Sequence, residues 1–94
     1  DQKWESVNSI ESQKYLNIIR NKFIELDEFN LENIESLMRN VLEEEEIKTK
    51  VGFQSTRVAI TGTKISPPLF ESIFALGKET SIARLTESIE KLTN

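Results

Sequence analysis

The 94-residue chain contains neither cysteine nor histidine. Without cysteine it can form no disulfide, no thiolate metal site and no thiol nucleophile. Without histidine it lacks the commonest general acid–base group and the imidazole metal ligand. These absences argue against an independent catalytic or metal-binding role. They are also compatible with a cytoplasmic protein, which is the location we expect.

Long apolar runs are absent as well. No stretch approaches the roughly 18–20 apolar residues of a membrane span, and nothing resembles a signal peptide, so we expect no membrane partner. The length fits one domain over residues 1–94, and a hydrophobic content of 37% is enough for a small core. Because the sequence begins at Asp1 without Met, we expect it to be an excised piece or a processed product.

Charge is unevenly distributed along the chain. The net charge of −4 at first argues against a nucleic-acid partner. Residues 1–47 hold five basic and twelve acidic side chains, a net charge of −7, whereas residues 48–94 hold seven basic and four acidic ones, a net charge of +3. Salt confines exposed charges to about 8–10 Å, so a phosphate near the C-terminal half would feel mainly that half. Chance asymmetry in a helical protein is the alternative.

Two helices are predicted in the N-terminal half. The apolar positions of the first lie mostly three or four residues apart: Trp4, Val7, Ile10, Tyr15, Leu16, Ile19, Phe23 and Leu26. The second has Asn30 as a favourable N-cap, and Phe29 and Ile34 are spaced for a hydrophobic staple. Its apolar stripe consists of Ile34, Leu37, Met38, Val41 and Leu42. The acidic residues 43–46 lie at the negative end of the helix, so we expect a frayed, solvated end there.

Residues 47–65 lack helical periodicity. Small and β-tolerant residues predominate, and Gly52 and Gly62 punctuate the segment. We interpret it as an extended connector that ends in a turn at Gly62, with room for short strand pairing.

Two further helices are predicted in the C-terminal third. Ser66 would cap the first, Pro67 suits its first position, and Gly77 suits a left-handed C-terminal position. The last helix begins near Thr80, with Ile82, Leu85, Ile89 and Leu92 on one stripe. The predicted fold class is therefore mostly α, a compact bundle of about four helices with one extended connector.

The residues favour binding over catalysis. Gly62-Thr63-Lys64 lacks the spacing of a phosphate-binding P-loop. Arg57 offers five donors in a planar fork that can grip a base edge or a phosphate. Ser66 offers a hydroxyl at a helix N-terminus, and Leu69 can pack against a base. The alternatives are an ion pair for Arg57, an N-cap for Ser66 and a core position for Leu69.

Three lysines add to this picture. Lys48, Lys50 and Lys64 are either solvated or placed to attract phosphate. A different class of function is also open, namely a helical protein–protein interaction module with an apolar groove near Phe53, Phe70 and Phe74. Salt dependence separates the two, because phosphate contacts weaken with salt and an apolar groove responds little.

The stretch from Arg57 to Leu92 closely resembles the C-terminal end of bacterial glutamyl-tRNA synthetases. The resemblance rests on Arg57-Val58-Ala59-Ile60-Thr61-Gly62, Ser66-Pro67-Pro68-Leu69-Phe70, Leu76-Gly77-Lys78-Glu79 and Ala83-Arg84-Leu85. Residues 31–42 match more loosely. Two departures concern the loop: Ser55-Thr56 stands where the family often has Pro-Leu, and Pro68 stands where it often has Gly.

The resemblance implies an anticodon-binding domain. In that family this region is the final helical subdomain, and it is associated with the first and middle anticodon bases. Arg57, Ser66 and Leu69 would contact bases, while Thr61 and Gly62 would shape the loop. The partners would be the anticodon loop of tRNA(Glu) and the rest of the synthetase chain, and we expect a monomer. The fragment itself would have no catalytic site, cofactor or metal. Its parent would attach glutamate to tRNA using ATP and Mg²⁺.

Overall fold

Five helices make up the part of the chain that the computed structural model describes, residues 10–62 and 68–93. Within these residues there is no strand. The helices are α2 (Ile10–Glu25), α3 (Leu31–Glu44), α4 (Thr49–Thr61), α5 (Leu69–Leu76) and α6 (Lys78–Thr93). The mostly-α prediction is confirmed, although the described chain has five helices where about four were predicted. None of them is long and apolar enough to cross a bilayer.

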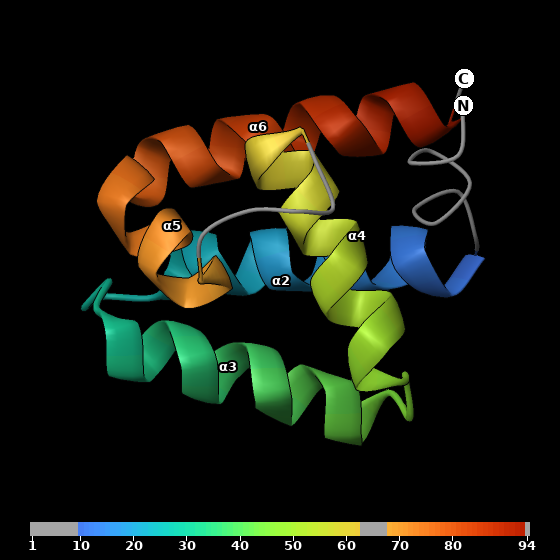
Figure 1. Cartoon of the computed structure of the whole chain (residues 1–94), viewed down its shortest axis with the longest axis horizontal. Coiled ribbons are helices and arrows are strands. Elements are labelled where there is room, and N and C mark those ends of the chain that lie inside the picture. Colours follow the sequence, from blue (N-terminus) through green and yellow to red (C-terminus); the bar gives the residue numbers. More distant parts are fainter. Residues whose placement is uncertain (1–9, 63–67, 94) are drawn as a thin grey trace.

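The helix α2 lies at the centre of the arrangement. It packs against α3 on one side and α6 on the other, and α4 crosses it (Figure 1). The short helix α5 contacts α3, α4 and α6 and so closes the remaining side of the bundle. Each helix therefore has an apolar face turned toward a shared interior.

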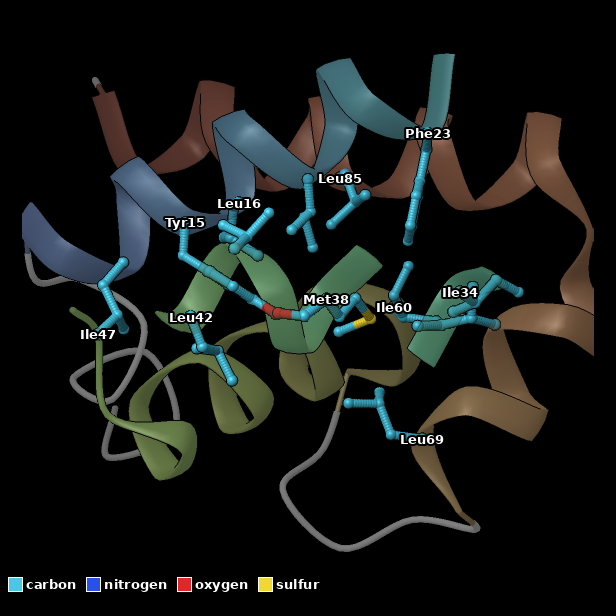
Figure 2. Packing of buried hydrophobic residues seen from close by; sticks show 13 residues of the cluster. Tyr15, Leu16, Phe23, Ile34, Met38, Leu42, Ile47, Ile60, Leu69 and Leu85 are labelled. Carbon is cyan, nitrogen blue, oxygen red and sulfur yellow. The ribbon is translucent and has the colours of Figure 1, made fainter. Parts of the chain in front are cut away.

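The core is built on one stripe of α2. Tyr15, Leu16, Ile19 and Phe23 recur at helical spacing, and none of the four has any exposed surface. They meet fully or almost fully buried residues from every other described helix, with Ile47 joining from the turn after α3 (Figure 2). Those residues are Ile34, Met38, Val41, Leu42, Ile60, Leu69, Ile73 and Leu85.

The buried Tyr15 hydroxyl has a defined partner. It donates a hydrogen bond to the Met38 carbonyl oxygen at 3.0 Å, and Figure 2 shows the ring reaching from α2 toward Met38 on α3. Burial raises the pKa of this hydroxyl above its usual range, while Arg39 acts in the opposite direction. The hydroxyl therefore stays protonated and keeps donating at physiological pH.

Both ends of α3 follow from its sequence. The Asn30 side chain accepts a hydrogen bond from the Asn33 amide at 2.8 Å, which confirms the predicted N-cap. At the other end Glu46 adopts a positive φ of 54°. The Glu46 amide donates to Glu43 and the Ile47 amide donates to Leu42, the paired bonds of a Schellman motif. The helix thus ends within residues 43–46 as predicted, but it ends in paired hydrogen bonds where a frayed end was expected.

The predicted extended connector over residues 47–65 is wrong, because residues 49–61 form α4. Its hydroxyl residues fit a helix by donating to carbonyls one turn back: Ser55 to Val51 at 2.6 Å, Thr56 to Gly52 at 2.8 Å and Thr61 to Arg57 at 2.6 Å. The Ser55 hydroxyl also lies 2.6 Å from the Ser12 hydroxyl of α2, from which it can accept a hydrogen bond, so contacts with α2 support the helix.

Two glycines act differently in and after α4. Gly52 is buried inside the helix, where an added Cβ would collide with Leu42 Cδ2 and lie 3.1 Å from Tyr15 Cε2. The missing side chain lets α4 approach the core closely. Gly62, in contrast, ends α4 with φ 81° and ψ 6°, a left-handed cap that glycine adopts without steric cost. The predicted break at Gly62 is correct, but it ends a helix.

The helices α5 and α6 are separated by Gly77 alone. Its φ of 89° is positive as predicted, but its ψ of 166° places it in a region open essentially to glycine, outside the left-handed helical region. The helix α5 begins at Leu69 with Pro68 at its N-cap position. Ser66 and Pro67, predicted as the cap and first residue, lie outside the described residues. Lys78 Nζ donates to the Leu26 carbonyl at 2.6 Å, which ties the start of α6 to the end of α2.

Candidate nucleic-acid interface

Arg57 has an unusual environment on α4. The residue is half-buried, and its Nε is buried with no hydrogen-bond partner. Among the described residues it takes part in none of the ion pairs, so the ion-pair alternative has no support there. A buried donor without a partner costs about 1–3 kcal/mol, and such a group is often explained by function. Arg57 Nε is therefore a buried donor for which the described residues supply no acceptor.

The structure places Leu69, the second predicted base contact, in the core and does not describe Ser66, the third. Leu69 is 4% exposed and belongs to the core. It offers almost no surface for a base, so the core alternative is what the structure shows, and Leu69 anchors the start of α5. Ser66 lies outside the described residues, as does Lys64. The described residues nearest to them in the chain are Gly62, which ends α4, and Pro68, which precedes α5.

Lys48 and Lys50 lie together at the start of α4. Both are exposed, and Lys48 occupies the N-cap position without making a side-chain capping bond. The first turn of α4 contains no acidic residue. Two cations beside the positive end of a helix dipole repel that end and favour an anion there. This placement suits the predicted phosphate contacts.

One face of α4 combines cations with an aromatic ring. Lys50, Phe53 and Arg57 lie three and four residues apart, so they lie along one side of the helix. The seven residue steps from Lys50 to Arg57 span about 10 Å along the axis. The helix thus places the Phe53 ring between two positive charges.

Sequence reasoning missed Arg39, which completes this face from α3. Its guanidinium carbon lies 5.5 Å from the ring centroid of Phe53 and 5.7 Å from that of Phe70. These distances are within the range of cation–π interactions. The sequence offered one signal for Arg39, its position four residues after Glu35, which predicts the ion pair that is observed at 2.8 Å.

The same contacts change the alternative apolar groove. Phe53 and Phe70 pack edge to face, with ring centroids 5.4 Å apart and planes at 89°. Arg39 lies over both rings, so a cation covers the surface that was expected to be apolar. Phe74 remains 48% exposed. The three phenylalanines thus do not combine into one open apolar strip.

Arg84 is a second arginine that sequence reasoning did not assign to the site. Its Nη1 donates to the Ile60 carbonyl at 2.6 Å and so ties α6 to the last turn of α4. It lines a hollow of about 330 Å³ beside Gly62. The residues lining that hollow are Val58, Ala59, Ile60, Thr61, Gly62, Arg84, Glu87, Ser88 and Lys91. Arg84 therefore helps fix the end of α4.

Comparison with known proteins now adds to the geometry. The model of the family described as "Anticodon binding domain" matches residues 1–89. This chain belongs to the anticodon binding domain family. The family assignment agrees with the resemblance read from the C-terminal motifs, and it extends over the helices for which those motifs say little.

The curated relatives of this anticodon binding domain include bacterial glutamate–tRNA ligases. The chain is 38% identical over 68 residues to glutamate–tRNA ligase 2 of Fervidobacterium nodosum, a match that covers 72% of the chain and 15% of the relative. It is 45% identical over 65 residues to glutamate–tRNA ligase of Corynebacterium jeikeium, covering 68% of the chain and 13% of the relative. The match to glutamate–tRNA ligase of Kocuria rhizophila is 44% over 61 residues, covering 64% and 12%. The chain thus corresponds to a small part of these ligases.

Proposed function

We propose that this anticodon binding domain reads the anticodon loop of tRNA(Glu) for a glutamate–tRNA ligase. The observation that carries the proposal is Arg57, a half-buried arginine on the face of α4 that holds Lys50 and Phe53, whose buried Nε has no hydrogen-bond partner among the described residues. Specific RNA recognition targets unpaired bases in loops, and an arginine fork can both stack on a base and bind its edge. The family match and the named relatives support the substrate class.

The ligase reaction itself belongs to a longer chain. The parent would attach glutamate to tRNA using ATP and Mg²⁺, and these 94 residues would only help select the tRNA. The described residues contain no group of three or more acidic side chains suited to a metal ion. We expect the domain to act in the cytoplasm as a monomer, joined to the rest of the synthetase.

The proposal divides the work among the described residues. Arg57 would donate to the first anticodon base, and one well-formed bidentate contact would discriminate by about 1–3 kcal/mol, by analogy with DNA readout. Lys48 and Lys50 would attract the backbone at the start of α4. Leu69 would act from the core by holding the start of α5 in place.

Titration by NMR tests the proposal directly. The 94-residue chain is titrated with an anticodon stem-loop carrying C-U-C and, separately, with one carrying G-U-C. We expect shifts around Arg57 and the start of α5 with the first RNA and much weaker ones with the second. The Arg57→Ala variant should bind the C-U-C stem-loop more weakly and lose most of the preference between the two.

A matched control is available on α2. Arg20 also carries a guanidinium, but it donates to Asn17 and Asn21 on its own helix. Arg20→Ala should leave both affinities unchanged. Equal binding of the C-U-C stem-loop by wild type and Arg57→Ala would sink the assignment of Arg57. Absence of binding by the wild type would overturn the proposed function for this chain.

Fewer observations support the alternative function, an apolar groove for a protein partner. It rests on Phe74, the one ring of the three expected that is about half exposed. Affinity for RNA should fall with salt, at a log–log slope of about −0.7 per phosphate contacted, whereas a groove binder should respond little. The same titration repeated at two salt concentrations therefore separates the two functions.

A further inference from the structure

Three helices meet at the side chain of Arg39. The residue comes from α3, Phe53 from α4 and Phe70 from α5, and the guanidinium lies in the corner formed by the two perpendicular rings. Nothing in the family resemblance assigned this position a role. The arrangement places a cation on the same side of α4 as Arg57, because Phe53 precedes Arg57 by one helical turn.

The guanidinium is held in one orientation and is still accessible. Its Nε donates to Glu35 Oε2 at 2.8 Å, and its carbon lies over both rings. Its two Nη groups have no hydrogen-bond partner among the described residues, and the side chain is 55% exposed. One edge of the fork is therefore bound by the protein, and the donors of the other edge are unused on a side chain that is more than half exposed.

Such an edge suits one chemical group in particular. A guanidinium fork matches the oxygens of a phosphate with two parallel hydrogen bonds. Holding the side chain in place before binding lowers the conformational entropy lost on binding. Glu35 does not cancel the charge, since it is itself 46% exposed and exposed ion pairs are weak. Lys50 and Arg57, one turn to either side of Phe53, add positive charge nearby.

We infer that Arg39, held by Phe53 and Phe70, forms a phosphate-binding fork that grips one backbone phosphate of an unpaired RNA loop. The inference rests on the proposed function, because the phosphate belongs to the RNA whose bases Arg57 would read. It separates two tasks on one surface: Arg57 contacts a base and Arg39 positions the backbone. Contacts to phosphate position a nucleic acid without reading its sequence.

Salt dependence of RNA binding tests the inference. In Arg39→Gln the affinity for the C-U-C stem-loop should fall, and the log–log salt slope should become shallower by about 0.7, the value for one single-strand phosphate contact. The preference for C-U-C over G-U-C should stay unchanged, which a general structural defect at the interface would not allow. Arg20→Gln on α2 is the matched control and should change neither quantity.

Two further variants separate charge from orientation. Arg39→Lys keeps the charge but loses the fork, so it should keep the wild-type slope while binding more weakly than wild type. Phe53→Leu removes one of the rings that hold the guanidinium and should weaken binding with the slope retained. Thermal unfolding of each variant checks that it is folded at the titration temperature. If Arg39→Gln is unfolded at that temperature, Arg39→Lys is used in its place to test the loss of the fork.

The outcomes distinguish failure of the phosphate-fork inference from failure of the proposed function on which it rests. Absence of RNA binding by the wild type overturns the proposed function. Binding by the wild type with an unchanged slope and affinity in Arg39→Gln overturns the phosphate fork and leaves the anticodon role of Arg57 standing. A lost preference for C-U-C at an unchanged slope would also overturn it, because Arg39 would then be reading a base.

Discussion

The helices α3 and α4 are nearly equal in length, but their sequences specify them in different ways. The helix α3 begins at a capping Asn30 and ends in a Schellman motif. The helix α4 begins at Lys48 without a capping bond, contains Gly52 and is rich in hydroxyl and β-branched residues. The features that specify α3 lie in its own sequence, whereas α4 depends on contacts with other helices. The less locally specified helix is the one that carries the candidate RNA-binding face.

The first and largest prediction asks whether α4 is nonetheless an integral part of the core. Ile34 on α3 and Ile60 on α4 are both fully buried. We expect Ile34→Ala and Ile60→Ala each to lower the free energy of unfolding by about 2–5 kcal/mol, because each leaves a cavity. Denaturant unfolding measures both. A loss below about 1 kcal/mol for Ile60→Ala alone would mean that α4 packs loosely.

The outcome for α4 shows where sequence reasoning reached its limit. Helical periodicity, a cap and a staple specified α3 within a residue or two, and the apolar stripes placed α2 and α6. In α4 the hydroxyl side chains of Ser55, Thr56 and Thr61 carry low helix propensity, and they are accommodated by carbonyls one turn back. Burial of Val58 and Ile60 then overrides the local preference. Neither effect can be read from a window of sequence.

The second prediction concerns the close approach of α4 to the core. A Gly→Ala change inside a helix normally stabilises it by up to about 1 kcal/mol. At Gly52 the new Cβ would meet Leu42 and the rigid Tyr15 ring, and overpacking costs about 1–3 kcal/mol. We therefore expect Gly52→Ala to destabilise the protein by about 1–2 kcal/mol, as measured by denaturant unfolding.

The matched control for Gly52 lies on α3. Ser36 is exposed in the helix interior, so Ser36→Ala should be neutral or stabilise by a few tenths of a kcal/mol, about the difference in propensity. Stabilisation by Gly52→Ala of the size expected from propensity would contradict the packing argument. It would show that Leu42 and Tyr15 move aside at little cost.

The candidate site was predictable only in part. Motif resemblance singled out Arg57, and charge singled out Lys48 and Lys50, all of which lie on α4 or at its start. Arg39 and Arg84 entered only through tertiary contacts, because their partners Phe70 and Ile60 are more than 20 residues away in the chain. For Leu69 the sequence left a base contact and a core position open, because nothing local distinguishes a core leucine from an exposed one.

The smallest predicted effect compares the two helix starts. Asn30→Ala removes the α3 cap and should lower the free energy of unfolding by about 1 kcal/mol. Lys48→Ser should raise it by a similar or smaller amount, because Lys48 has an extended backbone at φ −64° and ψ 137°, the conformation in which a serine side chain can cap. It also removes a charge that opposes the helix dipole. Denaturant unfolding of both variants checks the signs.

RNA binding turns this comparison into a test of why α4 lacks a cap. If Lys48 attracts a phosphate, Lys48→Ser should stabilise the protein and at the same time weaken binding of the C-U-C stem-loop, with a shallower salt slope. Asn30→Ala should show the reverse combination, lower stability with unchanged RNA affinity while the protein stays folded. Higher stability with unchanged affinity in Lys48→Ser would remove Lys48 from the interface. The missing cap would then have no functional explanation. The uncapped start of α4 would be tolerated because tertiary contacts stabilise the helix, as they also compensate for Gly52 and the hydroxyl residues in its interior.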